Sequence, residues 1–174
     1  MKQIVGVADC GISADPEDVL ITHALGSCLG VVAYDAGSGV GGLLHVMMPL
    51  SEINPEKARL NPYMFVDTAL PRLFEDLERR GARRKRMQVM VAGGASVHSS
   101  TGDRFAIGKR NLVAFKRIMW ASGLLIAAED VGGQRARTMR LHMDSGRVLV
   151  SSGSEEWELG PPDAKRQRRT RHVA

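Results

Sequence analysis

The sequence predicts an α/β domain in which helices flank a mixed, largely antiparallel β-sheet sandwich. Several short apolar runs precede the first helical pattern, strands and helices then follow one another, and the last regular segment resembles a hairpin. Such an order, without regular strand–helix–strand alternation, does not favour a doubly wound dinucleotide-binding fold. At 174 residues with 44% hydrophobic residues, the chain is long enough for one domain with a substantial core.

The amino-terminal part reads as four strands. KQIVGVAD (2–9), DVLITHAL (18–25) and LGVVAYD (29–35) are short and rich in apolar and β-branched residues. The turn sequence AGSG (36–39) then leads into VGGLLHVMMP (40–49). The third and fourth strands are therefore expected to form a hairpin.

Two helices are expected in the middle of the chain. Asn61 can cap the first and Pro62 suits its first position, while Gly81 is a plausible residue just past its end. Apolar residues between these points recur at spacings of three and four, which indicates one buried face. The second helix is predicted over about 108–122, with Gly123 ending it.

The remaining strands surround the second helix. MQVMVAGG (87–94) and LLIAAED (124–130) are short apolar runs of the kind found in buried strands. Residues 138–144 and 146–152 alternate apolar and polar positions around a Ser-Gly turn, which is a hairpin signal.

The charge of the chain is concentrated at its carboxyl end. Residues 163–174 carry five of the 24 Lys and Arg residues and one of the 19 acidic ones, so the preceding part holds 19 basic and 18 acidic residues. We predict one domain over 1–162 and a basic, disordered tail over 163–174. A nearly neutral body argues against nucleic acid as a partner. Without an apolar run long enough for a signal peptide or a membrane helix, we expect a cytoplasmic protein that does not insert into membranes.

The two cysteines do not predict a disulfide framework or a metal site. Cys10 and Cys28 are expected to be free thiols in a reducing compartment. No Cys-x-x-Cys or HExxH pattern occurs, so we expect no bound metal.

Chemistry is most strongly suggested by Gly26-Ser27-Cys28 and His45. A glycine before the pair allows a tight turn, in which successive backbone N–H groups of Ser27 and Cys28 could face a developing oxyanion. In the predicted hairpin, Cys28 and His45 lie near the same end of neighbouring strands, which are ~5 Å apart. These residues alone leave two readings open, a small buried cysteine or a nucleophile with a histidine base.

Several motifs in order resemble the CheD family, the chemoreceptor glutamine deamidases of bacterial chemotaxis. THALGSCLGVVAYD followed by GVGGLLHVMMP matches the family pattern of a Thr, Leu-Gly-Ser-Cys and a Gly-Gly-x-x-His strand closed by Pro. VAGGASV, IGKRN and EDVGGQRARTMRLHMDSGRV resemble later family segments. The resemblance covers roughly residues 3–152 and leaves the basic tail outside.

The resemblance implies a fold similar to the catalytic domain of cytotoxic necrotising toxins. It also implies hydrolysis of selected glutamine side chains on methyl-accepting chemotaxis proteins to glutamate, with release of ammonia. The family's catalytic Cys, His and Thr fall at Cys28, His45 and Thr22. On this basis Cys28 forms a thioester, His45 moves protons, Thr22 orients His45, and no cofactor is needed. A CheC-like phosphatase is an implied partner.

Other polar residues are interpreted as structural. Cys10 matches no motif, and His23 should point to the opposite face of its strand from Thr22. The loop around His98 to Thr101 is read as surface, and Asn111 as a brace of the second helix. The alternative function is a non-enzymatic adaptor that binds a CheC-like phosphatase and regulates chemotaxis signalling.

Overall fold

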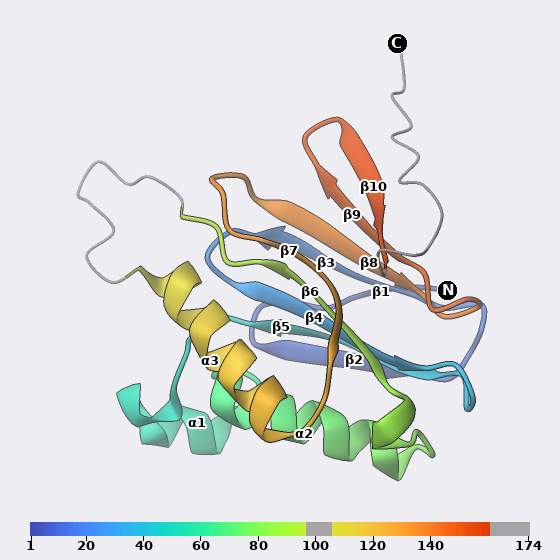
Figure 1. Cartoon of the computed structure of the whole chain (residues 1–174), viewed down its shortest axis with the longest axis horizontal. Coiled ribbons are helices and arrows are strands. Elements are labelled where there is room, and N and C mark those ends of the chain that lie inside the picture. The colour runs from blue at the N-terminus through green and yellow to red at the C-terminus, as the bar shows by residue number, and fades with distance from the viewer. Residues whose placement is uncertain (97–105, 161–174) are drawn as a thin grey trace.

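The computed structural model describes residues 1–96 and 106–160 and has three layers, two sheets and a layer of helices (Figure 1). The first sheet, in spatial order, contains β1 (Lys2–Ile4), β3 (Val19–Leu25), β8 (Arg137–His142), β9 (Val148–Ser152) and β10 (Glu155–Leu159). The second contains β2 (Asp9–Ser13), β5 (Val40–Val46), β4 (Leu29–Asp35), β6 (Gln88–Gly93) and β7 (Ile126–Val131). The helices are α1 (Pro55–Leu60), α2 (Val66–Arg79) and α3 (Ile107–Ala121), with short 3₁₀ turns at Ser51–Ile53 and Arg84–Arg86.

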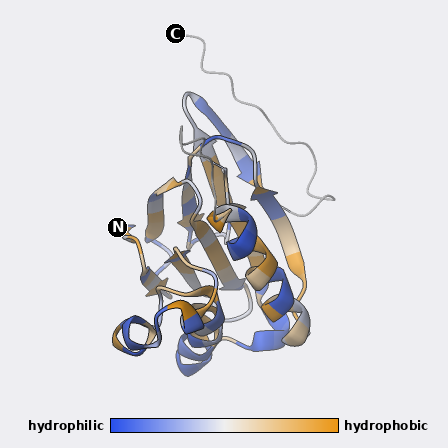
Figure 2. Ribbon diagram, turned by 90° about the vertical axis from the view of Figure 1, so that its left-hand side faces the viewer, coloured by the Kyte–Doolittle hydropathy of each residue, from blue (hydrophilic) through white to orange (hydrophobic). Residues whose placement is uncertain are grey.

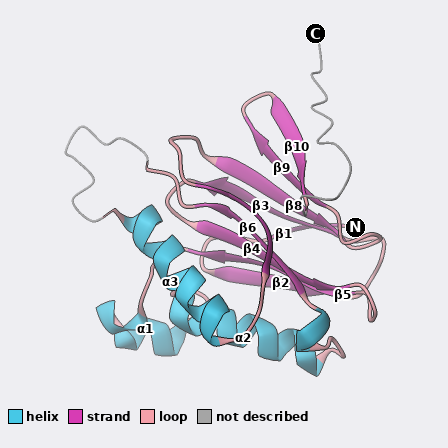
Figure 3. Ribbon diagram, in the orientation of Figure 1, coloured by secondary structure: helices cyan, strands magenta, loops and turns pink. Residues whose placement is uncertain are grey.

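The predicted fold class is confirmed. Among the described strands, only the β1–β3 and β6–β7 pairs are parallel, and the other pairs are antiparallel. Figure 3 shows the helices gathered on one side of the strands. The predicted tail 163–174 and the loop around His98 to Thr101 lie outside the described residues. Within the described residues, no helix is long and apolar enough to cross a membrane.

The second sheet is the middle layer, so its central strands are buried on both faces. Every residue of β4 and β5 is buried. Alternate residues face opposite sides of a strand, and Leu44 and Val46 accordingly join the core under α2 and α3, whereas Leu43 joins the core between the sheets. By this alternation His45 faces the first sheet. In Figure 2 the strands are largely in the hydrophobic colour, whereas the helices alternate between hydrophilic and hydrophobic colour.

The start predicted for the first helix is wrong. Asn61 ends α1, and α2 begins only at Val66. Tertiary hydrogen bonds occupy the intervening backbone: Met48 N donates to Met64 O, and Val66 N donates to Met48 O. These bonds hold the segment extended beside the end of β5, so Pro62 cannot begin a helix. The apolar face of α2 and its end before Gly81, where φ is 99°, agree with the prediction.

Three strands near the ends of the chain differ from expectation. The run predicted as one strand over 2–9 contains β1 only as far as Ile4, and the chain turns at Ala8 with a φ of 55° before β2 starts. Neither β2 nor β10 was predicted, because DCGIS and EEWEL lack a continuous apolar run. Each pairs with a neighbour that supplies the burial, β2 with β5 and β10 with β9.

The chain passes from one sheet to the other at the predicted cysteine turn. β3 belongs to the first sheet and β4 to the second, and Gly26-Ser27-Cys28 joins them. The register of β3 shifts between Thr22 and Leu25, and Ala24 there has a φ of 57°. This irregularity turns the chain toward the second sheet and places Cys28 at the edge of the space between the sheets.

Candidate active site

Thr22 and His45 meet across the two sheets. The Thr22 hydroxyl oxygen lies 2.7 Å from His45 Nδ1 and 2.8 Å from the Val5 carbonyl oxygen. Thr22 is fully buried and His45 is 1% exposed. Because the β3 residue and the β5 residue come from different sheets, this hydrogen bond joins the two layers at the site. Thr22 and His45, which the family resemblance pairs, are therefore in direct contact, and the orienting role of Thr22 stays a prediction.

The partners of Thr22 determine which nitrogen of His45 carries the hydrogen. A hydroxyl has one hydrogen, and a carbonyl oxygen can only accept. The Thr22 hydroxyl therefore donates to Val5 O and accepts from His45 Nδ1–H. His45 Nε2 is then the nitrogen with the free lone pair, and it is buried without a hydrogen-bond partner among the described residues. This is the tautomer required of a histidine that accepts a proton at Nε2.

Burial keeps both the imidazole and the thiol uncharged at neutral pH. Desolvation lowers the pKa of His45 below its ordinary 6.5. Desolvation also raises the pKa of the Cys28 thiol above its ordinary 9.0, against a smaller opposite effect of the residue's own backbone N–H. Both shifts favour the uncharged forms at neutral pH, a neutral imidazole on His45 and a neutral thiol on Cys28.

Cys28 packs on the side of the second sheet that His45 faces. Gly30 pairs directly with His45, and the ladder ends at Leu29 and Val46, one residue after Cys28. Cys28 is two residues before Gly30, and it packs against the core between the sheets. Both residues thus lie close to the same end of the β4–β5 ladder, and no hydrogen bond joins the Cys28 thiol to His45 Nε2. Cys28 is half-buried, whereas His45 is fully enclosed.

All three carbonyl groups of the cysteine turn are held by neighbouring segments. Gly26 O accepts from Ala95 N at 2.8 Å and Cys28 O from Gly94 N at 2.8 Å. Ser27 O accepts from the side-chain amide of Asn111 at 2.9 Å. In contrast, neither the Ser27 nor the Cys28 N–H donates a hydrogen bond to another residue of the described chain. Two unused donors therefore lie in succession at the predicted oxyanion position.

Glycines allow the supporting segments to approach the turn closely. A Cβ on Gly93, whose φ is 111°, would lie 2.2 Å from the Cys28 carbonyl oxygen. A Cβ on Gly108 would lie 2.7 Å from the carbonyl oxygens of Gly94 and Ala95. These positions explain why glycine occurs in the VAGGASV and IGKRN segments: any larger residue would push the turn or α3 away.

A further layer of contacts stands behind these glycines. Gly132 N donates to Gly93 O at 2.9 Å, and Ser96 N donates to Gly133 O at 2.8 Å. The Arg137 guanidinium binds Gly132 O and the Asp130 carboxylate. The EDVGG segment and the start of β8 thus hold residues 93–96 in place, and this segment in turn hydrogen-bonds to the cysteine turn.

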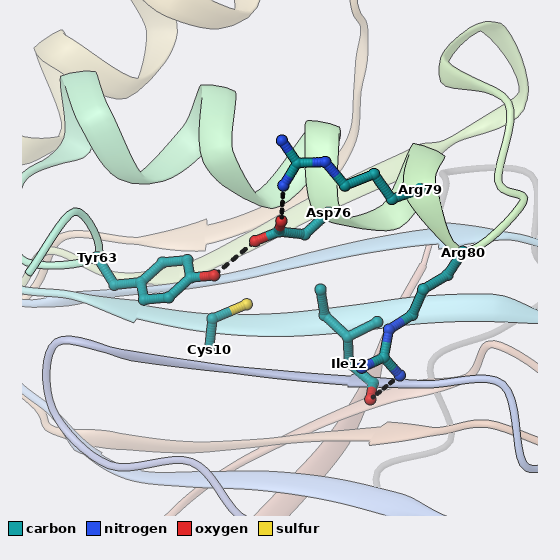
Figure 4. Close-up of a pocket in the computed structure, with 6 residues that line it drawn as sticks. All are labelled: Cys10, Ile12, Tyr63, Asp76, Arg79 and Arg80. Atoms are coloured by element: carbon teal, nitrogen blue, oxygen red, sulfur yellow. Dashed lines mark hydrogen bonds and ion pairs between the residues drawn. The ribbon is translucent and has the colours of Figure 1, made fainter.

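The other sequence-predicted candidates lie away from this site. His23 is exposed and contacts Thr138, which agrees with its predicted orientation. Cys10 packs on the helix side of the second sheet and lines a pocket with Tyr63, Asp76 and two arginines (Figure 4). Burial, reinforced by Asp76, raises the pKa of the Cys10 thiol to about 12. Such a thiol is a poor nucleophile at neutral pH.

Asn111 is the residue whose connection to the site the sequence interpretation missed. It was read as a brace of its own helix, but it is fully buried and both of its hydrogen bonds leave α3 for Ser27 O and Met47 O. A signal was present in the sequence: Asn111 lies on the same face of α3 as Ala114 and Phe115, which are buried. A carboxamide on a buried face needs partners.

Comparisons with known proteins identify relatives along most of the chain. The family model described as CheD chemotactic sensory transduction matches residues 47–152. A protein of Solibacter usitatus (strain Ellin6076), named a probable chemoreceptor glutamine deamidase CheD, is 48% identical over 162 residues, covering 92% of this chain and 95% of the relative.

Two further relatives carry the same kind of name. Probable chemoreceptor glutamine deamidase CheD 2 of Anaeromyxobacter dehalogenans (strain 2CP-C) is 46% identical over 151 residues, covering 87% of this chain and 94% of the relative. The probable chemoreceptor glutamine deamidase CheD of Methanococcus maripaludis (strain C5 / ATCC BAA-1333) is 40% identical over 151 residues, covering 87% and 95%. The ordered motifs, the sheet arrangement and these matches agree, and the chain belongs to the CheD family.

Proposed function

We propose that this chain is a chemoreceptor glutamine deamidase in which Cys28 is the nucleophile, His45 the general base and acid, and Thr22 the residue that orients His45. The names of the relatives supply the reaction and the receptor substrate. The observation that carries the assignment of roles is the hydrogen-bond pair of Thr22, which leaves His45 Nε2 with a free lone pair on the side of the second sheet where Cys28 also packs.

The first half of the reaction transfers the acyl group of glutamine to the enzyme. His45 Nε2 removes the Cys28 thiol proton as the sulfur attacks the side-chain carbonyl carbon, so a C–S bond forms and the carbonyl oxygen becomes an oxyanion. His45 then returns the proton to the amide nitrogen, the C–N bond breaks, and ammonia leaves. A thioester between Cys28 and the glutamyl side chain remains.

The second half hydrolyses the thioester. Neutral His45 takes a proton from water as the water oxygen attacks the thioester carbonyl, and it returns that proton to the sulfur as the C–S bond breaks. The products are the glutamate side chain and the restored Cys28 thiol. One water molecule is consumed and one ammonia is released for each amide, so no external oxidant, reductant or organic cofactor enters the balance.

The unused N–H groups of Ser27 and Cys28 suit both oxyanions in this scheme. Each tetrahedral species carries negative charge on the former carbonyl oxygen, adjacent to the sulfur. Donors already oriented toward that point need no reorganisation, and a single such donor contributes about 10²–10³ to kcat in other enzymes. Free thiols and a receptor substrate are consistent with reaction in the cytoplasm, and a CheC-like phosphatase partner rests on the resemblance alone.

The function is tested by incubating the protein with purified receptor cytoplasmic fragments and following conversion of glutamine to glutamate by peptide mass spectrometry. Cys28→Ala should reduce conversion to the background without enzyme. Cys10→Ala is the matched control, because it removes the other thiol on the far side of the second sheet and should leave conversion unchanged.

Equal conversion by wild type and Cys28→Ala would refute the proposed mechanism. Receptor binding by the wild type without any conversion would favour the adaptor function instead. Trapping a thioester on Cys28 with hydroxylamine, which yields a hydroxamate of the target glutamine, would test the covalent step separately.

A further inference from the structure

We propose that Asn111 is a positioning residue for deamidation: its carboxamide ties the cysteine turn to the end of β5 and thereby sets the direction of the N–H groups that receive the oxyanion. The inference rests on the proposed function for its chemistry. Its structural part, the fixing of the turn, stands on contacts within the chain and can be measured without any turnover.

The Asn111 amide nitrogen donates both of its hydrogens to these two segments. Nδ2 lies 2.9 Å from Ser27 O and 3.0 Å from Met47 O, and the side chain is fully buried. The orientation of the carboxamide is determined by these neighbours, because the opposite orientation would place its oxygen against two carbonyl oxygens. No acid or apolar residue of similar size could donate both bonds.

The carboxamide oxygen shows that Asn111 is not there for packing alone. Asn111 Oδ1 is buried and has no hydrogen-bond partner among the described residues. Leaving a buried acceptor unpaired costs stability, whereas an apolar side chain at the same position would carry no such cost. The unpaired carboxamide oxygen lowers stability, whereas the carboxamide nitrogen makes two hydrogen bonds. This combination is expected of a side chain whose role is to position its neighbours.

The bond to Ser27 O controls the Cys28 N–H directly. The Ser27 carbonyl and the Cys28 N–H belong to one planar trans peptide unit, so the two groups point in opposite directions. Fixing the carbonyl toward Asn111 fixes the N–H away from it. Ala95 N acts in the same way on the Gly26 carbonyl and hence on the Ser27 N–H.

The bond to Met47 O connects the same side chain to the strand of the base. Met47 directly follows β5 and lies two residues after His45, so its carbonyl belongs to the strand end that carries the imidazole. Asn111 thus links the nucleophile's turn and the base's strand through a single group. It is the one side chain among the described residues that hydrogen-bonds to a carbonyl of the turn, since Gly94 and Ala95 use backbone N–H groups.

The experiment compares Asn111→Ala and Asn111→Asp with the control Met119→Ala. The aspartate variant keeps the volume of the side chain but cannot donate both bonds, so it separates hydrogen bonding from packing. Met119 is buried on the same helix and belongs to the core beneath it, and its truncation lowers stability without removing a bond to the turn.

Three measurements are made on each full-length variant. Both Asn111 variants should lower kcat about tenfold to 100-fold, with KM for the receptor fragment unchanged, because misplaced donors act on the transition state. Alkylation of Cys28 by iodoacetamide forms no oxyanion and should change much less than kcat. Exchange of the Gly94 and Ala95 amide hydrogens, followed by mass spectrometry, should accelerate in the Asn111 variants relative to Met119→Ala.

The outcomes separate the inference from the function on which it rests. Wild-type kcat in Asn111→Asp, or an equal loss of kcat in Met119→Ala, would overturn the positioning role. Unchanged exchange at Gly94 and Ala95 would overturn the fixing of the turn, even if no activity were found in any protein. Indistinguishable conversion by wild type and Cys28→Ala would refute the proposed function alone, because the exchange measurement needs no catalysis.

Discussion

Replacing Thr22 by valine tests the role of the bond between the two sheets with almost no change in shape. Valine keeps the volume and branching of threonine but lacks the hydroxyl. The change removes two bonds at once, the acceptor for His45 Nδ1–H at 2.7 Å and the donor to Val5 O at 2.8 Å. Thr22→Ser is the matched control, because it retains the hydroxyl and loses only a methyl group.

The structure gives the size of the expected effect. Without an acceptor, the Nδ1–H tautomer of His45 is no longer favoured in its buried site, and the loss of one buried hydrogen bond costs about 1–3 kcal/mol. If that energy is the bias toward the productive tautomer, kcat should fall between about fivefold and about 150-fold, at 1.36 kcal/mol per factor of ten. The unpaired Val5 carbonyl should also lower the free energy of unfolding by about 1–3 kcal/mol.

The assay is the initial rate of glutamine conversion in a receptor fragment, measured across pH, together with denaturant unfolding. In Thr22→Val the imidazolium form of His45 loses a hydrogen-bond acceptor, so the pKa of His45 should fall further and the acid limb of kcat/KM should move to lower pH. Thr22→Ser should keep the wild-type pH profile and lose about 1 kcal/mol of stability with its methyl group.

Two results would refute this reasoning. If Thr22→Val retained the wild-type kcat and pH profile, the tautomer of His45 would not depend on Thr22. If Thr22→Ser were as slow as Thr22→Val, the methyl group and its packing, and not the hydroxyl, would be the important feature.

Three further predictions follow from the same structure. The pH profile of kcat/KM should be a broad plateau. Activity should be lost on the acid side as His45 gains a proton, below its ordinary pKa of 6.5, and on the alkaline side as the Cys28 thiol loses its proton, above its ordinary pKa of 9.0. A bell-shaped profile centred near neutrality and narrower than these limits would contradict this prediction. Gly93→Ala should lower kcat about 100-fold, because its Cβ would lie 2.2 Å from the Cys28 carbonyl oxygen, whereas Gly81→Ala shares the positive φ without any atom within 4 Å and should lose stability but not kcat. Asp35→Ala should lower the free energy of unfolding by about 2–4 kcal/mol at neutral pH, because the buried carboxylate accepts from a guanidinium and from backbone N–H groups. The same contacts lower the pKa of Asp35, chiefly through the guanidinium, so this difference between Asp35→Ala and wild type should shrink as the pH falls below about 4 in urea titrations.

The sequence could predict the part of the site that depends on local chain geometry. A four-residue AGSG turn between two apolar runs sets the pairing of the strands it joins, and a strand alternates its faces with a period of two. These rules predict Cys28 and His45 near the same end of one hairpin; the β4–β5 ladder pairs Gly30 with His45 and ends next to Cys28, and the catalytic pairing of the two residues stays a prediction.

The contacts between sheets could not be obtained in this way. Thr22 reaches His45 from a strand of the other sheet, and the position of one sheet over another depends on the packing of both. Only the family resemblance suggested that pair. The same limitation explains why the helix start predicted at Asn61 is wrong. The segment after Asn61 is held extended by backbone hydrogen bonds with Met48, and no residue type in the sequence marks such a backbone partner.

Asn111 illustrates why buried polar residues are the hardest to interpret from sequence. Its position on an apolar helix face indicates that it needs partners, but the partners are the carbonyls of Ser27 and Met47. Every residue has a carbonyl, so no residue type marks the acceptor. A reading that searches for complementary side chains therefore finds none and assigns a role within the helix.

The segments that define the family resemblance converge on one turn, although they lie far apart in the chain. The family model matches residues 47–152, a range that contains none of Thr22, Cys28 and His45. What that range does contain is the support of the cysteine turn: Gly93 and the two residues after it, Asn111, and the glycine pair behind them.

The proposed mechanism depends strongly on such support, because burial favours the neutral forms of both Cys28 and His45. In that mechanism no ion pair holds the thiol in place, and the proton moves only when a substrate carbonyl is in position to become an oxyanion. The barrier then depends on whether the Ser27 and Cys28 N–H groups already point to that oxygen. A variant that keeps the three proposed catalytic residues but loses the support of the turn should therefore fold and bind its substrate, yet turn it over slowly.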